Sequence, residues 1–123
     1  MDTVTVRIPA APKYLQVVRL VAAGLASRLR FTIDDIEDLK IAVDELAAYL
    51  TGAQGRDGLL EITFSVEDDR IEIEGTGKFD GDVKIRTELT DFSRQILMTV
   101  ADKAWLQQDD GIPRFGLTKT RQS

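Results

Sequence analysis

The chain has 123 residues and a mass of 13.7 kDa, which is the size of one folded domain. Apolar residues make up 43% and charged residues 30%, a balance typical of a soluble globular protein with one hydrophobic core. Its 16 basic side chains against 21 acidic ones give a net charge of -5, which argues against direct binding of nucleic acid or of an anionic membrane. We therefore expect a single domain over residues 1–123.

The sequence contains neither cysteine nor histidine. This composition excludes disulfides, thiol nucleophiles, Ser-His-Asp hydrolysis, HExxH zinc chemistry and phosphohistidine transfer, and we predict no metal site. Any proton transfer must use Asp, Glu, Lys or Tyr side chains. No apolar run approaches the roughly 18 residues of a membrane span, and no signal peptide opens the chain. We therefore expect a cytoplasmic protein without membrane contact.

The first half of the chain predicts one strand followed by two helices. Residues 3–8 alternate between apolar and polar side chains, which is typical of a half-buried strand. Apolar residues then recur every three or four positions after Pro12, a residue suited to the first turn of a helix. A second helix is expected to begin at Thr32, whose side chain can form a capping box with Asp35, and to end at Gly52.

The second half predicts a hairpin, a loop, a third helix and a last strand. Residues 60–73 contain two alternating segments separated by an acidic turn, as in an antiparallel hairpin. Residues 75–84 contain three glycines and are expected to form a loop. Apolar spacing over residues 89–104 predicts a helix with Trp105 near its end, followed by a turn and a strand through Phe115.

The predicted order of elements is β-α-α-β-β-α-β, which indicates an α+β fold. Because the strands and helices do not form repeating βαβ units, a parallel doubly wound sheet is not expected. A mostly antiparallel sheet with helices packed on one face, a two-layer α/β sandwich, accounts for the pattern. The last residues, 118–123, are expected to be frayed.

The second helix carries a row of candidate site residues along one edge. Asp38, Ala42, Glu45 and Tyr49 are spaced by four, three and four positions, so they share one side of the helix. Two carboxylates around a small residue could form the wall of a ligand site. The alternative is an acidic helix face that is only solvated.

Three other positions raise a functional question. Gly75 and Gly77 follow Glu74 at the expected strand end, where they either allow close approach of a phosphate or planar base or simply form a turn. Arg19, among apolar neighbours on the first helix, is either a partner contact or a snorkelling side chain. Ser27, Ser65 and Ser93 have no base beside them in the sequence and give no catalytic signal.

Several segments together resemble a known family. They read RIPA, VVRLVAAGL and DDIEDLKIAVDEL, followed by a hairpin, a glycine-containing loop, a helix and a strand ending LTK. This arrangement resembles the RsbW/SpoIIAB-type anti-sigma factors of the GHKL (histidine-kinase-like, Bergerat-fold) ATPases, most specifically over residues 34–46, which look like the family's N-box helix. The resemblance implies a two-layer α/β sandwich that binds a sigma factor. Many members also phosphorylate a serine on an anti-anti-sigma (STAS-type) protein, using ATP and Mg²⁺.

The resemblance assigns roles on the second helix. Glu45 falls on the glutamate that the family uses as general base. Tyr49 falls where the family has a Mg²⁺-binding asparagine, and a phenol is a poor ligand for this cation. Without that ligand, the cation that neutralises phosphoryl charge is badly held.

The glycine-rich boxes of the family are also altered. The family's adenine-reading DxGxG segment is matched only by Glu74, Gly75, Thr76 and Gly77, with Glu for Asp and one spacer missing. The box before the third helix is matched by residues 91–95, which contain no glycine. The resemblance therefore implies a degenerate ATP site made up of Asp38, Ala42, Tyr49, Glu74, Gly75 and Gly77.

Our leading hypothesis is an anti-sigma-like regulator that acts by partner switching with a sigma factor or an anti-anti-sigma protein. Arg19 lies where the family's first helix faces its partners, whereas ATP binding is expected to be lost or weak. We further expect Tyr49 to fill the old nucleotide cavity, with its hydroxyl hydrogen-bonded.

Two alternatives stay open. One is an active ATP-dependent protein-serine kinase that uses Glu45 as base and another Mg²⁺ ligand, with both cofactors implied by the resemblance alone. The other is an interaction or dimerisation domain without a sigma partner. A homodimer is compatible with every reading, because family members dimerise.

Overall fold

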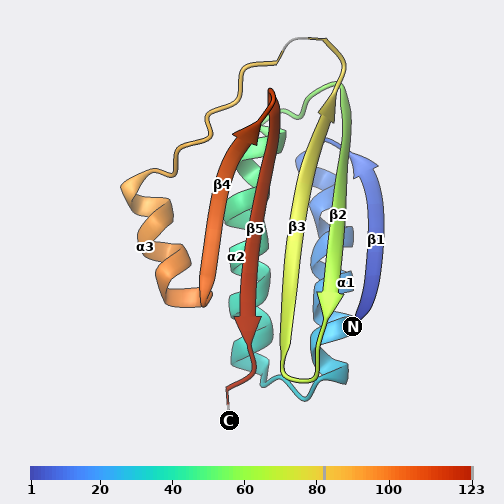
Figure 1. Cartoon of the computed structure of the whole chain (residues 1–123), viewed down its shortest axis with the longest axis vertical. Coiled ribbons are helices and arrows are strands. Elements are labelled where there is room, and N and C mark those ends of the chain that lie inside the picture. The colour runs from blue at the N-terminus through green and yellow to red at the C-terminus, as the bar shows by residue number, and fades with distance from the viewer. Residues whose placement is uncertain (82, 123) are drawn as a thin grey trace.

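The computed structural model describes residues 1–81 and 83–122 and contains one five-stranded sheet and three α-helices. In chain order the elements are β1 (Asp2–Pro9), α1 (Leu15–Arg28), α2 (Ile33–Thr51), β2 (Gly58–Val66), β3 (Arg70–Phe79), α3 (Asp91–Val100), β4 (Lys103–Asp109) and β5 (Ile112–Thr120), with a short 3-10 turn, η1 (Pro12–Tyr14), before α1. The strands lie in the order β1-β2-β3-β5-β4, and every neighbouring pair is antiparallel (Figure 1).

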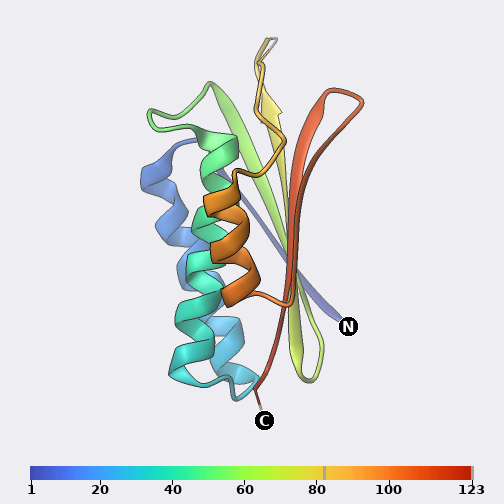
Figure 2. The ribbon, with the colours of Figure 1, turned by 90° about the vertical axis from the view of Figure 1, so that its left-hand side faces the viewer.

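All three helices cover the same face of the sheet, and the other face has no helix on it (Figure 2). The expected α+β two-layer sandwich is therefore confirmed. Its core lies between the sheet and the buried stripe of α2, and the largest fully buried side chains are Leu39, Leu46, Leu50, Leu60, Ile62, Phe64, Ile71, Ile73 and Phe115. None of the helices in residues 1–81 and 83–122 combines the length and apolar character that a membrane crossing requires.

The start of α2 forms as the sequence predicts. The Asp35 backbone N–H donates to Thr32 Oγ1 at 3.0 Å, and the Thr32 backbone N–H donates to Asp35 Oδ2 at 3.4 Å. These two bonds make up the predicted capping box. The helix then runs to Thr51 and ends at Gly52, as expected.

The prediction of a third helix as far as residue 104 was wrong. Helix α3 ends at Val100, Ala101 is extended, and a strand that the sequence did not predict, β4, begins at Lys103. This strand pairs with β5 over its whole length, and Trp105 lies opposite Gly116. Apolar spacing near residue 100 fits a last helical turn as well as a strand, and pairing with β5 decides between them. The observed order is therefore β-α-α-β-β-α-β-β.

The predicted loop over residues 75–84 begins later than expected. Gly75 and Gly77 continue β3, which ends at Phe79, and they pair with Ile62 and Leu60 of β2. Glycine is needed there because a side chain on Gly75 would overlap the Phe115 ring. Residue 82 of the predicted loop lies outside the described residues.

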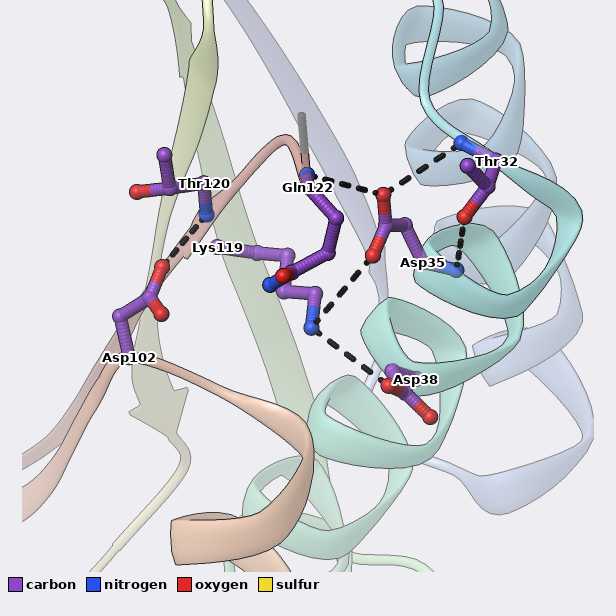
Figure 3. A network of polar contacts seen from close by, with 7 residues as sticks. All are labelled: Thr32, Asp35, Asp38, Asp102, Lys119, Thr120 and Gln122. Carbon is purple, nitrogen blue, oxygen red and sulfur yellow. Dashed lines mark hydrogen bonds and ion pairs between the residues drawn. The ribbon is translucent and has the colours of Figure 1, made fainter.

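The prediction of a frayed C-terminal tail was also wrong for residues 118–122. Thr118 to Thr120 belong to β5, and the backbone N–H of Gln122 donates to Asp35 Oδ2 at 3.2 Å (Figure 3). The buried Lys119 ammonium lies 3.9 Å from Asp35 Oδ1 and 3.5 Å from Asp38 Oδ2. These contacts tie the end of the sheet to α2. Residue 123 lies outside the described residues.

Candidate functional site

The C-terminal half of α2 and the first turn of α3 meet in a chain of hydrogen bonds. The Thr90 backbone N–H donates to the Tyr49 hydroxyl at 3.0 Å. The Tyr49 hydroxyl donates to Ser93 Oγ at 2.7 Å, and Ser93 Oγ donates to Glu45 Oε2 at 2.5 Å. We call these four residues the hydroxyl network. Its terminal bond is charge-assisted because the final acceptor is a carboxylate.

Helix α3 places Ser93 in this network through its own N-terminal cap. Thr90 is the N-cap residue, and its Oγ1 accepts from the Ser93 backbone N–H at 3.0 Å. Ser93 is only 4% exposed. The sequence gave no reason to select this serine, since Glu45 is 48 positions away and only the packing of two helices brings them together.

The environment of Tyr49 changes its acidity. Burial raises the pKa of the phenol, but hydrogen bonds with Ser93 and Thr90 outweigh burial and hold the pKa below its ordinary value of 10.0. The nearby charge of Glu45 acts in the opposite direction. The expected hydrogen bonding of the Tyr49 hydroxyl is therefore confirmed.

A surface depression of about 310 Å³ remains open beside the hydroxyl network. Its lining is formed by Glu45, Ala48, Tyr49, Arg86, Thr90 and Ser93. Tyr49 therefore forms part of the wall of this depression and does not fill it. The volume is at the lower end of the ~300–1,000 Å³ range of small-molecule pockets.

The other two members of the predicted row on α2 lie elsewhere. Ala42 is fully buried in the core. Asp38 forms an ion pair with Lys119 near the C-terminal end of β5 (Figure 3). Only Glu45 and Tyr49, of the four residues in that row, contribute to the hydroxyl network.

The predicted glycine segment is part of the sheet and not an open turn. Glu74 is exposed on the strand between inward-facing neighbours, and its Oε2 lies 3.6 Å from a guanidinium nitrogen of Arg114. Gly75 and Gly77 are buried, and side chains at these positions would overlap the rings of Phe115 and Phe79. The space that these glycines leave is thus occupied by the protein's own aromatic side chains.

Arg19 lies where α1 packs beside α2. Its guanidinium Nη1 is 2.8 Å from Asp44 Oδ1, and the two side chains are 33% and 45% exposed. Leu20, the next residue on α1, is 64% exposed. Arg19 is therefore accessible at the helical surface, although an acidic neighbour already pairs with it.

The residues present do not match the requirements of ATP with Mg²⁺. The Tyr49 oxygen, which the resemblance places at the family's magnesium ligand, is committed to Ser93 and Thr90. Within residues 1–81 and 83–122, no three acidic side chains come together as a metal cluster. The two glycines that would admit a nucleotide are covered by aromatic rings.

Comparison with known proteins gives the family. The chain is 31% identical over 129 residues to the serine-protein kinase RsbW of Halalkalibacterium halodurans, and the match covers 90% of this chain and 79% of that protein. This chain belongs to the RsbW family. The resemblance to an RsbW-type anti-sigma factor is therefore confirmed. No protein-family model matches the chain.

Other relatives match a shorter part of this chain. The RsbW serine-protein kinases of Bacillus pumilus and Bacillus subtilis are each 40% identical, over 78 and 75 residues. These matches cover 59% and 58% of this chain and 48% and 47% of the relatives. The chain thus spans about half the length of these RsbW proteins.

A solved structure supports the fold. The crystal structure of the RsbU and RsbW domains of a Mycobacterium tuberculosis protein matches with a TM-score of 0.69 and 14% sequence identity. The match covers 98% of this chain and 32% of that one. At this identity the likeness concerns the architecture alone, and it agrees with the histidine-kinase-like α/β sandwich.

Proposed function

We propose that this RsbW-family protein is a cytoplasmic partner-switching regulator that binds a sigma factor, an anti-anti-sigma (STAS-type) protein or both, without efficient phosphoryl transfer. Membership of the RsbW family supports this class of partner. The altered nucleotide site supports the absence of transfer. In this proposal the scaffold and its partner surface are retained, whereas the binding of ATP is lost or weak.

The covered glycines are the observation that carries the proposal. Glycine in a nucleotide-binding segment leaves room for a ligand to approach the backbone. Here the room at Gly75 is taken by Phe115, and the room at Gly77 by Phe79 and Pro113. A nucleotide that approached Gly75 would have to displace a ring from the core, because Phe115 is fully buried, whereas Phe79 beside Gly77 is only partly buried. Displacing the Phe115 ring would cost about 3–5 kcal/mol, the loss expected for one buried aromatic ring.

The position of Tyr49 supports the same conclusion for Mg²⁺. This cation prefers carboxylate, amide and water oxygens in near-octahedral geometry. A phenol that donates to Ser93 and accepts from Thr90 offers it no comparable ligand. The charge that phosphoryl transfer develops would therefore be poorly neutralised at this site.

The partner surface is assigned to α1, with Arg19 as its central charge. An accessible arginine beside an exposed leucine has the composition of a protein contact, since Arg is enriched in interfaces. An acidic group on the partner would compete with Asp44 for the guanidinium. A homodimer is compatible with this assignment.

The proposal is tested by measuring binding to the sigma factor and to the anti-anti-sigma protein of the source organism, with and without Mg²⁺ and ATP. We expect binding that ATP does not change and that Arg19→Ala weakens by about tenfold or more, as for an interface hot spot. Arg28→Ala, an exposed arginine on the same helix, is the matched control. Binding that requires ATP, or that loses nothing with Arg19→Ala, would contradict the proposal.

A second candidate function is an active protein-serine kinase of the RsbW type. Two points favour it: the curated relatives are named serine-protein kinases, and the resemblance assigns Glu45 to the position of the family's base. Transfer of labelled phosphate from ATP to the anti-anti-sigma protein, abolished by Glu45→Gln, would establish this function in place of the first.

A further inference from the structure

The Glu45 carboxylate is already engaged by a hydroxyl of the same chain. Ser93 Oγ lies 2.5 Å from Glu45 Oε2 and donates to it. A general base has to lie within about 2.6–3.2 Å of the oxygen whose proton it removes. At 2.5 Å, just below the short end of this range, Ser93 is already bonded to the oxygen that a hydroxyl brought by another protein could use.

We propose that Ser93 is an internal substitute for an acceptor hydroxyl, which takes Oε2 of Glu45 and so competes with hydroxyl groups of other proteins for this carboxylate. This inference rests on the proposed function in one respect: it names a contact that disfavours proton transfer to Glu45. The competitor is a side chain of this protein, and the contact is autoinhibitory. An incoming serine would have to displace Ser93 to reach Oε2.

The direction of the hydrogen bonds fixes this arrangement. A serine hydroxyl has one proton and two lone pairs. Ser93 accepts from the Tyr49 hydroxyl at 2.7 Å and from Thr90 Oγ1 at 3.1 Å, so its only proton points to Glu45. Each donor in the network therefore points toward the carboxylate, and each bond strengthens the next.

The backbone around Ser93 holds the side chain in place. Its own N–H donates to Thr90 Oγ1 in the cap of α3, and the helix is anchored by Leu97 and Val100, which are 3% and 6% exposed. Ser93 itself is 4% exposed, so its hydroxyl is shielded from other proteins. The Ser93 side chain is thus held in a fixed position beside the Glu45 carboxylate and does not behave as a surface serine.

The test measures how fast the Glu45 carboxylate reacts with a water-soluble carbodiimide and glycine ethyl ester, with the labelled sites read by mass spectrometry. Glu37, on the same helix with its side chain 56% exposed, is the internal reference. We expect slow labelling of Glu45 in the wild type. In Ser93→Ala we expect labelling about tenfold faster, on the order of what one charge-assisted hydrogen bond contributes. Thr99→Ala, which removes an exposed hydroxyl from the same helix, should leave the rate unchanged.

Two results would overturn the proposal. One is an equal rate at Glu45 in the wild type and in Ser93→Ala. The other is a rise in Ser93→Ala that Asp91 shares, because that would reflect a loosened helix and not an opened carboxylate. Tyr49→Phe keeps the Ser93 hydroxyl, so Glu45 should stay slow in this variant, and a rise as large as in Ser93→Ala would also overturn the proposal.

The proposed function and this inference fail separately. Tight binding of ATP would contradict the loss of the nucleotide site and would leave the labelling result unaffected. Labelling of Glu45 at the rate of Glu37 in the wild type would contradict the proposed role of Ser93. It would have no consequence for nucleotide binding.

Discussion

Replacing Lys119 by methionine tests the tie between the sheet and α2. The lysine stem is kept in length and apolar character, and only the charge is removed. In the folded protein the Lys119 and Asp35 side chains are 5% and 3% exposed. Lys119→Met therefore leaves the Asp35 carboxylate buried without its cation (Figure 3).

The structure limits the size of the loss. Removing one partner of a buried ion pair costs about 3–5 kcal/mol in the most enclosed cases. Here the nitrogen–oxygen distances are long, 3.9 Å to Asp35 and 3.5 Å to Asp38, and Asp38 is 36% exposed and can rehydrate. Asp35 also keeps its bonds from the backbone N–H groups of Thr32 and Gln122. We therefore expect Lys119→Met to lower the free energy of unfolding by about 2 kcal/mol.

Urea unfolding followed by circular dichroism measures this change. The midpoint should fall without a change in slope, and the melting temperature should fall by roughly 6–12 °C. Lys103→Met, an exposed lysine on the edge strand β4, is the control and should stay within about 0.5 kcal/mol of the wild type. A loss below about 0.5 kcal/mol for Lys119→Met, which is the range of an ordinary surface substitution, would refute the reasoning.

Further predictions follow from single contacts. Gly75→Ala should lower the free energy of unfolding by about 1–3 kcal/mol in urea unfolding, because its Cβ overlaps a buried ring, and wild-type stability would contradict the packing. The folded-state pKa of Tyr49 is depressed, so ionisation of this phenol stabilises the folded protein above pH 10. This stabilisation is lost as the pH falls through the folded-state pKa. Tyr49→Phe should abolish this pH dependence of the free energy of unfolding. Thr32→Ala should lower the unfolding free energy by about 1 kcal/mol through loss of the N-cap, and no measurable loss would contradict the capping box.

Sequence patterns predicted the elements that depend on local signals. The capping box of Thr32 and Asp35 and the alternation in β1 are properties of a few neighbouring residues, and both elements form as expected. Strand β4 could not be predicted in the same way. Its partner β5 follows a turn, and apolar spacing near Val100 fits a helix equally well.

Only the part of the candidate site that lies on a single helix could be predicted from the sequence. Glu45 and Tyr49 share a face of α2, so their spacing placed them together. Ser93 comes from another helix, and no spacing relates it to Glu45. The rings that cover Gly75 and Gly77 come from β5 and from the end of β3, and the sequence does not show which way such side chains point until the sheet register is known.

Strand alternation also determines which way the Glu74 side chain points. Successive side chains on a strand point to opposite faces, so inward-facing glycines at 75 and 77 require that Glu74 faces away from the helices. The sequence placed Gly75 and Gly77 in a loop after a strand that ends at Glu74, and this rule does not apply in a loop. Strand β3 instead continues to Phe79.

The most direct test of the central claim is calorimetric titration of ATP into the purified protein, with and without Mg²⁺. We predict no detectable binding heat at millimolar ATP, which corresponds to a dissociation constant weaker than about 1 mM, and no effect of Mg²⁺. Micromolar binding that Mg²⁺ strengthens would contradict it. That result would mean that the rings over Gly75 and Gly77 move aside for a nucleotide and that the protein is to be studied as a kinase.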